Sequence, residues 1–271
     1  MKIFKNKHKL QKEILNINNL SFIPTMGGLH KGHVSLIKRS RSFNGKCLVS
    51  IFVNPKQFNK KKDFKSYPRN LYKDLKLLKY LKVDFVYLPN YKDIYSFKPR
   101  KKVYLAKFSK KLCGKFRKGH FEGVLNVVNR LIEIIKPKYI FLGIKDLQQL
   151  LLIKSHIKMR NIKTKVISCK IIREKNGVAC SSRNFNLSNK QKIIAADIYN
   201  YFSKLKKKLK KTDIFSQRNK LKKILLNLGA SKIDYVVNYN IKDLKTSNTT
   251  NKNSKIFIAY YIKKVRLIDN I

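Results

Sequence analysis

Residues 22–33 read FIPTMGGLHKGH, an apolar run that ends in a loop with two glycines and then in two histidines. The pattern predicts a strand, a loop and the start of a helix near Gly32. Gly27 and Gly28 lack a Cβ atom, so the backbone can turn sharply there and a bulky anion can approach the amide groups. The first N–H groups of a helix and its dipole also favour negative charge. We therefore expect a phosphate site at this loop.

His30 and His33 stand three positions apart, so in helical geometry they lie on one side, next to the expected phosphate site. There they can donate hydrogen bonds to a phosphate whose negative charge grows during a reaction. The simpler interpretation is that both are partly buried polar residues near a turn. The coincidence of strand, glycines and spaced histidines favours the phosphate site.

The chain has 271 residues, 43% of them hydrophobic, which suffices for one large domain or two modest ones. Lys and Arg total 64 against 14 acidic residues, a formal net charge of +50. Such a charge ordinarily indicates nucleic acid or an anionic surface as a partner. Here the lysines are spread along the whole chain among many Asn, Ile, Phe and Tyr residues, all of which have A/T-rich codons. We therefore attribute the charge to an A/T-rich bacterial genome and expect no specific nucleic-acid partner.

The four cysteines are Cys47, Cys113, Cys169 and Cys180, which lie far apart without CxxC spacing. They indicate neither a zinc site nor a disulfide framework. The N-terminus lacks the apolar core and cleavage site of a signal peptide, and no later run approaches the roughly 18 apolar residues of a membrane span. We expect a cytoplasmic protein with reduced thiols and no membrane partner.

Strands and helices alternate through most of the chain. Strands are expected at 47–54, 83–88, 139–143 and 164–172, with a possible one at 103–105, and helices at 71–81, 121–135 and 146–159. Continuous apolar runs indicate strands buried on both faces, and leucines at helical spacing indicate an inward helix face. This alternation predicts an α/β fold with a doubly wound parallel sheet, whose ligands lie at the carboxyl ends of the strands.

A smaller α+β domain is expected at the C-terminal end. Ser188 and Gln191 fit the capping box S-x-x-Q and predict a helix that runs toward Leu209. A second helix is expected at 213–228, followed by strands at 233–237 and 256–260 with the polar segment 245–255 as a loop. We therefore divide the chain into domains 1–175 and 176–271.

Two motifs place polar groups at the ends of expected strands. NPKQF at 54–58 contains Gln57, whose amide can both donate to and accept from a hydroxylated carboxylic acid. GIKDLQQL at 143–150 brings a cation, a carboxylate and two amides to a strand-to-helix junction. There Lys145 can neutralise phosphate, and Asp146 can accept from ribose hydroxyls.

Two further motifs carry glycines and charged groups. IREKNGVACSSRN at 172–184 offers the hydroxyl groups and the guanidinium of residues 181–183 to a phosphate chain. RKGHFEGV at 117–124 precedes an expected helix. In this motif a packing role for the two glycines and a direct substrate role for His120 are equally favoured.

Together with the HxGH signature at 30–33, these ordered motifs resemble those of the pantothenate synthetases, a family of the HxGH nucleotidyltransferase superfamily. The YPR triplet at 67–69, Asp74 and the terminal strand at 266–271 match the same family. Four positions depart from the family pattern: Lys73 and Ile144 in place of acidic residues, Asn176 in place of aspartate, and Cys180 in place of methionine. The resemblance covers nearly the whole chain. It implies a Rossmann-like nucleotide-binding domain and a smaller C-terminal domain that covers the active site.

The resemblance also implies a reaction. ATP and Mg²⁺ would activate pantoate as pantoyl adenylate, and β-alanine would then give pantothenate and AMP, in an enzyme expected to be a homodimer. Catalysis is thereby assigned to His30, His33 and Lys145, and binding of pantoate and β-alanine to Gln57 and Gln149. ATP binding is assigned to Met26, Gly27, Gly28, Leu29, His30, Lys31, Gly32, His33, Gly143, Ile144, Lys145, Asp146, Ile172, Cys180, Ser181, Ser182 and Arg183. The protein ligands of Mg²⁺ stay open.

Two other classes of protein stay open at this stage. Another HxGH enzyme, such as a cytidylyltransferase, would keep the histidines but has no reason to carry both the glutamine of NPKQF and the QQL segment. A basic nucleic-acid-binding protein without catalytic activity would account for the charge alone. It would leave the motifs unexplained.

Overall fold

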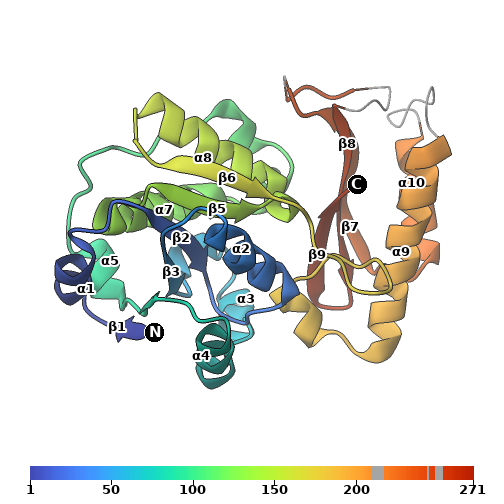
Figure 1. Ribbon diagram of the computed structural model, residues 1–271. Coiled ribbons are helices and arrows are strands. Elements are labelled where there is room, and N and C mark those ends of the chain that lie inside the picture. Colours follow the sequence, from blue (N-terminus) through green and yellow to red (C-terminus); the bar gives the residue numbers. More distant parts are fainter. Residues whose placement is uncertain (209–216, 243, 248–252) are drawn as a thin grey trace. The chain divides into compact units, whose positions relative to one another are not determined.

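A six-stranded parallel sheet organises the N-terminal part of the chain (Figure 1). The strands are β1 (Lys2–Phe4), β2 (Leu20–Thr25), β3 (Lys46–Ile51), β4 (Phe85–Tyr87), β5 (Tyr139–Gly143) and β6 (Lys165–Cys169). They lie in the order β1-β4-β3-β2-β5-β6, and every neighbouring pair is parallel. β2 pairs with β3 on one side and with β5 on the other, so the strand order reverses beside β2.

The computed structural model describes residues 1–208, 217–242, 244–247 and 253–271. These residues form two compact units, 1–171 and 172–271. The sequence placed this division a few residues later, after residue 175.

Helices connect the strands of the first unit. They are α1 (Lys7–Ile14), α2 (Lys31–Arg41), α3 (Lys61–Lys65), α4 (Leu71–Tyr80), α5 (Tyr91–Tyr95), α6 (Cys113–Phe116), α7 (His120–Ile135) and α8 (Leu147–Met159). Short 3₁₀ segments are η1 (Pro55–Gln57), η2 (Lys107–Lys110) and η3 (Ile144–Asp146).

Both faces of the sheet are covered. α2 and α4 pack on one face, where Ile37 and Leu78 share a buried apolar cluster with Val49 and Phe141 of the strands. Side chains alternate along a strand, so the fully buried Leu48 beside Val49 points to the opposite face. On that face α7 contacts α1, α5 and α8, and α8 contacts β5. The α/β class with a doubly wound parallel sheet is therefore confirmed.

The possible strand at 103–105 is wrong. The backbone N–H of Tyr104 donates to Nδ1 of His156 at 3.0 Å, so a buried side chain takes the place of a neighbouring strand. β1 and α1 were not expected, because the Lys-rich N-terminus shows no clear apolar period. The helix expected from residue 146 begins one residue later, after the 3₁₀ turn η3.

The second unit contains a three-stranded antiparallel sheet and two long helices. Its strands are β7 (Lys232–Asn240), β8 (Ser254–Ile262) and β9 (Val265–Asn270), in the order β7-β8-β9. Its helices are α9 (Asn189–Lys208), α10 (Arg218–Asn227) and the 3₁₀ segment η4 (Ser182–Asn186). Phe202 of α9, Leu225 of α10 and Ile258 of β8 share one buried cluster. The α+β character expected for this part is confirmed.

The capping box at the start of α9 is formed as predicted. The backbone N–H of Ser188 donates to Oε1 of Gln191 at 2.9 Å, and the backbone N–H of Gln191 donates to Oγ of Ser188 at 3.3 Å. The expected helix ends at 209 and 213–216, and residues 248–252 of the expected loop at 245–255, lie outside the described residues. Among the residues that are described, no helix has both the length and the apolar character needed to span a bilayer.

His156 gives the fold a measurable pH dependence. It is fully buried, and because Nδ1 accepts from Tyr104, Nε2 carries the proton and donates to Oδ1 of Asn129 at 3.0 Å. Burial lowers its pKa from 6.5 to about 4, and nearby Arg160 adds a smaller effect of the same sign.

We predict that the free energy of unfolding falls as the pH drops from 6.5 toward 4, because the unfolded chain protonates this histidine before the folded chain does. Each pH unit within that window accounts for at most about 1.4 kcal/mol from this residue. Denaturant unfolding of wild type and His156→Leu against pH checks this. The variant should be less stable at neutral pH but show a flatter profile, and a profile as steep as that of the wild type would contradict the assignment.

Candidate active site

Three loops at the carboxyl ends of neighbouring strands form the candidate site. Residues 26–30 follow β2, residues 52–57 follow β3, and η3 follows β5. In open α/β sheets, ligands bind at the carboxyl ends of strands where the strand order reverses. Because the order reverses beside β2, the fold brings the predicted site residues of the first unit to the position where a ligand is expected.

The turn between β2 and α2 depends on two glycines and one carboxylate. Gly27 and Gly28 have φ angles of +77° and +60°, which glycine adopts without steric cost. Asp74 of α4 is 4% exposed and accepts from the backbone N–H groups of Gly28 at 2.9 Å and Leu29 at 2.8 Å. A Cβ on Gly27 would lie 2.9 Å from Oδ2 of Asp74. Two of the amides expected to face an anion thus donate to a carboxylate of the same unit.

His30 and His33 cap the first turn of α2 with their ring nitrogens. Nδ1 of His30 accepts from the backbone N–H of Gly32 at 3.1 Å, and Nδ1 of His33 accepts from the backbone N–H of His30 at 3.3 Å. A neutral imidazole that accepts at Nδ1 carries its proton at Nε2. The ring centroids are 4.1 Å apart, so the start of α2 holds two Nε2–H donors side by side.

His33 is neutral near pH 7. Burial holds its pKa well below the ordinary value of 6.5, and the neighbouring His30 and Lys145 lower this pKa further. Lys145 belongs to η3, its side chain is 18% exposed, and its Nζ lies 3.4 Å from Oδ1 of Asp146. β5 pairs with β2, so the junction after β5 lies beside the loop that carries the histidines. The arrangement offers N–H donors and an ammonium group to developing negative charge.

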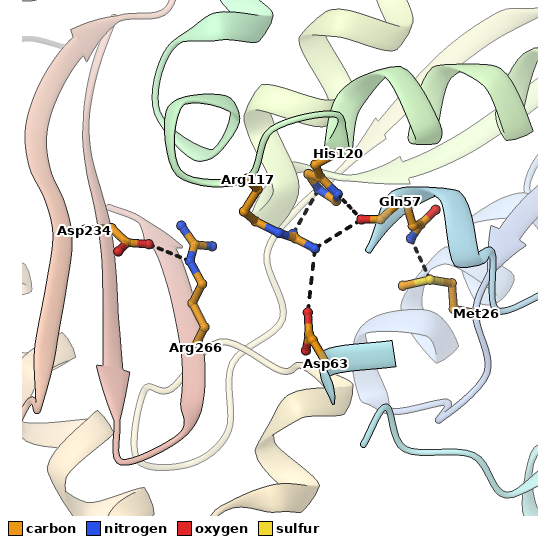
Figure 2. A network of polar contacts seen from close by, with 7 residues as sticks. All are labelled: Met26, Gln57, Asp63, Arg117, His120, Asp234 and Arg266. Atoms are coloured by element: carbon orange, nitrogen blue, oxygen red, sulfur yellow. Dashed lines mark hydrogen bonds and ion pairs between the residues drawn. The ribbon is translucent and has the colours of Figure 1, made fainter. Parts of the chain in front are cut away.

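Gln57 lies in η1, and the position of this turn depends on α7. The Gln57 side chain is buried, and its Nε2 donates to Sδ of Met26 (Figure 2). Asn54 is fully buried, with Nδ2 3.4 Å from Oε1 of Gln57 and 3.1 Å from the carbonyl oxygen of Gly123. A Cβ on Gly123 would lie 2.2 Å from the carbonyl oxygen of Lys56. Glycine at 123 therefore allows α7 to support the turn that presents Gln57.

Arg117 and His120 contact the backbone of the same turn (Figure 2). Nδ1 of His120 lies 2.8 Å from the carbonyl oxygen of Gln57, and Nη1 of Arg117 lies 3.0 Å from Nε2 of His120. Nη2 of Arg117 lies 3.4 Å from the same carbonyl oxygen and 3.9 Å from Oδ2 of Asp63. His120, left open between two roles by the sequence, thus bonds to the main chain of another predicted site residue.

The two adjacent glutamines of α8 have different environments. Gln148 is buried, where its Oε1 accepts from the backbone N–H of Cys113 and its Nε2 donates to the carbonyl groups of Phe108 and Lys111. Gln148 therefore holds the segment before α6 in place. Gln149 is half-buried and lies about 100° further around the helix.

The stretch 172–184 belongs to the second unit. Arg173 pairs with Ala179 in an isolated antiparallel bridge, and its guanidinium donates to both carboxylate oxygens of Asp269 at 2.6 and 3.0 Å. The guanidinium also lies 4.1 Å from the ring centroid of Tyr199. Gly177 turns with φ +87° directly against that ring. These contacts tie the base of the loop to the sheet and helix of its own unit.

The predicted ATP-binding residues of this stretch take part in local contacts. Sγ of the buried Cys180 donates to Oε1 of Glu174 at 3.2 Å, which fits a packing role and not that of a nucleophile. Oγ of Ser181 caps η4 by accepting from the backbone N–H of Arg183 at 3.3 Å. Ser182 is buried, whereas Ile172 and Arg183 are half-buried.

Sequence reasoning missed the supporting roles of Asn54, Asp63 and Arg117. Asn54 could have been recognised as a cap, because an Asn-Pro pair after a strand favours a turn and its Oδ1 accepts from the backbone N–H of Lys56. Asp63 lies in the Lys-rich run KKKDFK at 60–65, where no pattern marks it. Its role depends on a partner more than fifty residues away in the chain.

A family model for pantoate-beta-alanine ligase matches residues 2–271. This chain belongs to the pantoate-beta-alanine ligase family. The match spans both units, so it covers the histidine loop, the η1 turn, the β5 junction and the stretch 172–184 together. The family inferred from the sequence motifs is confirmed.

Individual relatives agree with the family match. The pantothenate synthetase of Francisella tularensis subsp. novicida is 39% identical, over 98% of this chain and 94% of that protein. The crystal structure of a Francisella tularensis pantoate-beta-alanine ligase complexed with beta-gamma ATP and beta-alanine has a TM-score of 0.85 at 38% identity, over 100% and 97% of the two chains. The crystal structure of the pantothenate synthetase from Thermus thermophilus has a TM-score of 0.88 at 27% identity, over 100% and 99%. A ligase of this family with a Rossmann-like domain is thereby confirmed.

We predict that Asp74→Asn slows pantoate-dependent exchange of pyrophosphate into ATP by about tenfold, because one loop amide then faces an NH₂ group in place of an oxygen. Exchange kinetics of the folded variant measure this effect. Asp93 offers a matched control, since it is also buried and accepts from the backbone N–H groups of Asn90 and Lys7. Asp93→Asn should lower stability but leave exchange near the wild-type rate. Equal exchange rates in the two variants would contradict the role of Asp74.

Proposed function

We propose that this enzyme joins (R)-pantoate to β-alanine in two steps at the carboxyl edge of its parallel sheet. A carboxylate and an amine do not condense at neutral pH, because the carboxylate is a poor electrophile with a poor leaving group. A pantoate oxygen therefore first attacks the α-phosphorus of ATP, which forms pantoyl adenylate and releases pyrophosphate. The amine of β-alanine then attacks the acyl carbon, loses a proton and displaces AMP, which leaves pantothenate.

The observation that carries this proposal is the pair of Nε2–H donors on His30 and His33. Both Nδ1 atoms accept from backbone N–H groups, so the fold selects the tautomer before any substrate binds. We assign both histidines to the phosphates as hydrogen-bond donors, with Lys145 as the cation that balances the charge moving onto pyrophosphate. Its lowered pKa keeps His33 neutral, so its Nε2–H is available as a hydrogen-bond donor to the phosphates.

Pantoate and β-alanine are assigned to the carboxamides of Gln57 and Gln149. The burial of Gln57 supports this assignment, because a carboxamide held by its surroundings can discriminate hydroxyl groups by direction as well as by charge. Adenosine is assigned to Gly143, Asp146 and Ile172. The remaining contacts with ATP are assigned to Met26, Gly27, Gly28, Leu29, Lys31, Gly32, Ile144, Cys180, Ser181, Ser182 and Arg183.

Mg²⁺ enters this proposal as part of the substrate, MgATP. Within the described ranges of the chain, no group of three or more His, Cys, Asp and Glu side chains is arranged to hold a metal ion. Asp74 is engaged by two backbone N–H groups. The side chains that the structure describes therefore do not fit a resident metal. Mg²⁺ commonly keeps several waters and binds substrate phosphates, which suits delivery with ATP.

We also propose that the enzyme acts in the cytoplasm, as a homodimer and without a specific nucleic-acid partner. All four cysteines are free and buried, which suits a reducing compartment. The homodimer rests on the resemblance to the family. The even spread of lysines along the sequence supports the last point, because dispersed charge favours only salt-sensitive, sequence-independent binding.

Formation of AMP by the purified enzyme should require pantoate, β-alanine, ATP and Mg²⁺ together. A coupled assay for AMP, with each component omitted in turn, measures this requirement. Without β-alanine, exchange of pyrophosphate into ATP should persist while steady AMP release stops, because only the first step can run. Activity with CTP and a phosphorylated alcohol, and none with pantoate, would instead identify a cytidylyltransferase.

His33→Asn should slow pantoate-dependent exchange by about 10²–10³, with a smaller effect on the KM of pantoate. The asparagine oxygen can still accept from the backbone N–H of His30, so the helix cap is kept while the Nε2–H donor is lost. Exchange rates and melting temperatures measured on the same preparations separate these effects. His8→Asn, at an exposed position of α1, serves as the control. A folded His33→Asn variant with unimpaired exchange would refute the assigned role.

A further inference from the structure

The main-chain carbonyl of Gln57 is bonded by two side chains from a distant part of the sequence. His120 reaches it through Nδ1 at 2.8 Å and Arg117 through Nη2 at 3.4 Å (Figure 2). A guanidinium only donates hydrogen bonds, so the contact from Nη1 of Arg117 requires Nε2 of His120 to accept. Nδ1 therefore carries the proton and donates to the carbonyl oxygen. Arg117 thus selects the tautomer of His120 that bonds to Gln57.

The turn has few backbone hydrogen bonds of its own. η1 is three residues long; the backbone N–H of Phe58 donates to the carbonyl oxygen of Pro55 at 3.1 Å, whereas that of Gln57 lies 3.4 Å from the carbonyl oxygen of Asn54, near the limit of a hydrogen bond. The carbonyl bonded by His120 belongs to the same residue as the carboxamide. A displacement of this carbonyl therefore moves the carboxamide with it.

The two contacting side chains are themselves anchored. Both are only 8% exposed, and Arg117 has the carboxylate of Asp63 at 3.9 Å. His120 begins α7, whose next turn carries Gly123 against the carbonyl oxygen of Lys56. The chain of contacts runs from Asp63 of α3 to Arg117 in the loop before α7, then to His120 at the start of α7, and ends at the main chain of Gln57 in η1.

We infer that His120 is a positioning residue that aligns the carboxamide of Gln57 for pantoate, with Arg117 fixing its tautomer. This inference rests on the proposed assignment of Gln57 to pantoate. It gives His120 an effect on substrate affinity without contact with the substrate. It also explains why a histidine suits this position, since one ring nitrogen must accept from Arg117 while the other donates to a carbonyl.

Two variants of similar size and polarity test the inference. In His120→Asn the amide nitrogen takes the place of Nδ1 and can still donate to the carbonyl of Gln57. In His120→Gln the amide lies near the place of Nε2, where it can meet Arg117, but no donor remains at the δ position. We expect His120→Gln to raise the KM of pantoate about tenfold and His120→Asn by no more than about threefold, with the KM of ATP and the kcat of exchange near wild type in both.

A merely structural role for His120 would lower the melting temperature in both variants and leave their KM values for pantoate alike, which would overturn the inference. His156 provides the matched control, because it is a buried histidine of the same unit that also bonds to a backbone group and a side chain. His156→Gln should lower the melting temperature without a selective change in the KM of pantoate. A selective rise in that variant would also overturn the inference.

Gln57→Ala separates failure of this inference from failure of the proposed site. If Gln57→Ala leaves the KM of pantoate unchanged in an active enzyme, the assignment of Gln57 to pantoate is wrong, and the inference is wrong with it. If Gln57→Ala raises that KM but the two His120 variants do not differ, the assignment stands and only the positioning role of His120 is overturned.

Discussion

The carboxylate of Asp74 fixes the place where β2 turns toward α2, and much of the candidate site depends on this contact. Removing a carboxylate from water is costly unless donors replace the water, and here the backbone N–H groups of Gly28 and Leu29 do so. The turn makes these two hydrogen bonds with both of its glycines at positive φ angles, a conformation that glycine adopts without steric cost. α2 starts directly after this turn, so the direction of its two capping histidines is set by a side chain of α4.

This contact is one of several in which a very basic chain uses its few acidic residues inside the fold. Asp234 and Arg266 form an ion pair at 2.7 Å with side chains 2% and 10% exposed (Figure 2), and Asp269 binds Arg173 through both oxygens. Breaking such a buried pair leaves an uncompensated charge, which destabilises a protein far more than the loss of a surface pair. The surplus lysines have a much weaker electrostatic effect on stability, because exposed charges more than a Debye length apart are largely screened by salt. Net charge therefore says little about how this fold is held together.

Some residues of the candidate site can be recognised from the sequence, and others cannot. The residues that can face a substrate, which are histidines, a lysine and glutamines, lie in short motifs. Each motif follows a strand, and the carboxyl ends of these strands lie at one edge of the sheet. The residues that hold them are scattered. Asp63 of α3 and Arg117 of the loop before α7 lie on separate segments and meet only in the folded chain. Gln148 and Gln149 are neighbours in one motif, yet only the structure distinguishes the buried one that bonds to the 108–113 segment from its half-buried neighbour.

The sequence by itself determined the class of fold, the family and the capping box of α9, because apolar periodicity, glycine loops and helix caps act over a few neighbouring residues. The failed strand at 103–105 marks the limit of this information, since its apolar residues fit a strand but the N–H of Tyr104 is taken by His156. Only the tertiary structure decided that Asp74, 46 residues along the chain, would cap the histidine loop, and which ring nitrogens of His30, His33 and His120 carry a proton. Tautomers and loop geometry depend on hydrogen-bond donors and acceptors that packing brings together. A local sequence pattern does not determine which distant residue supplies them.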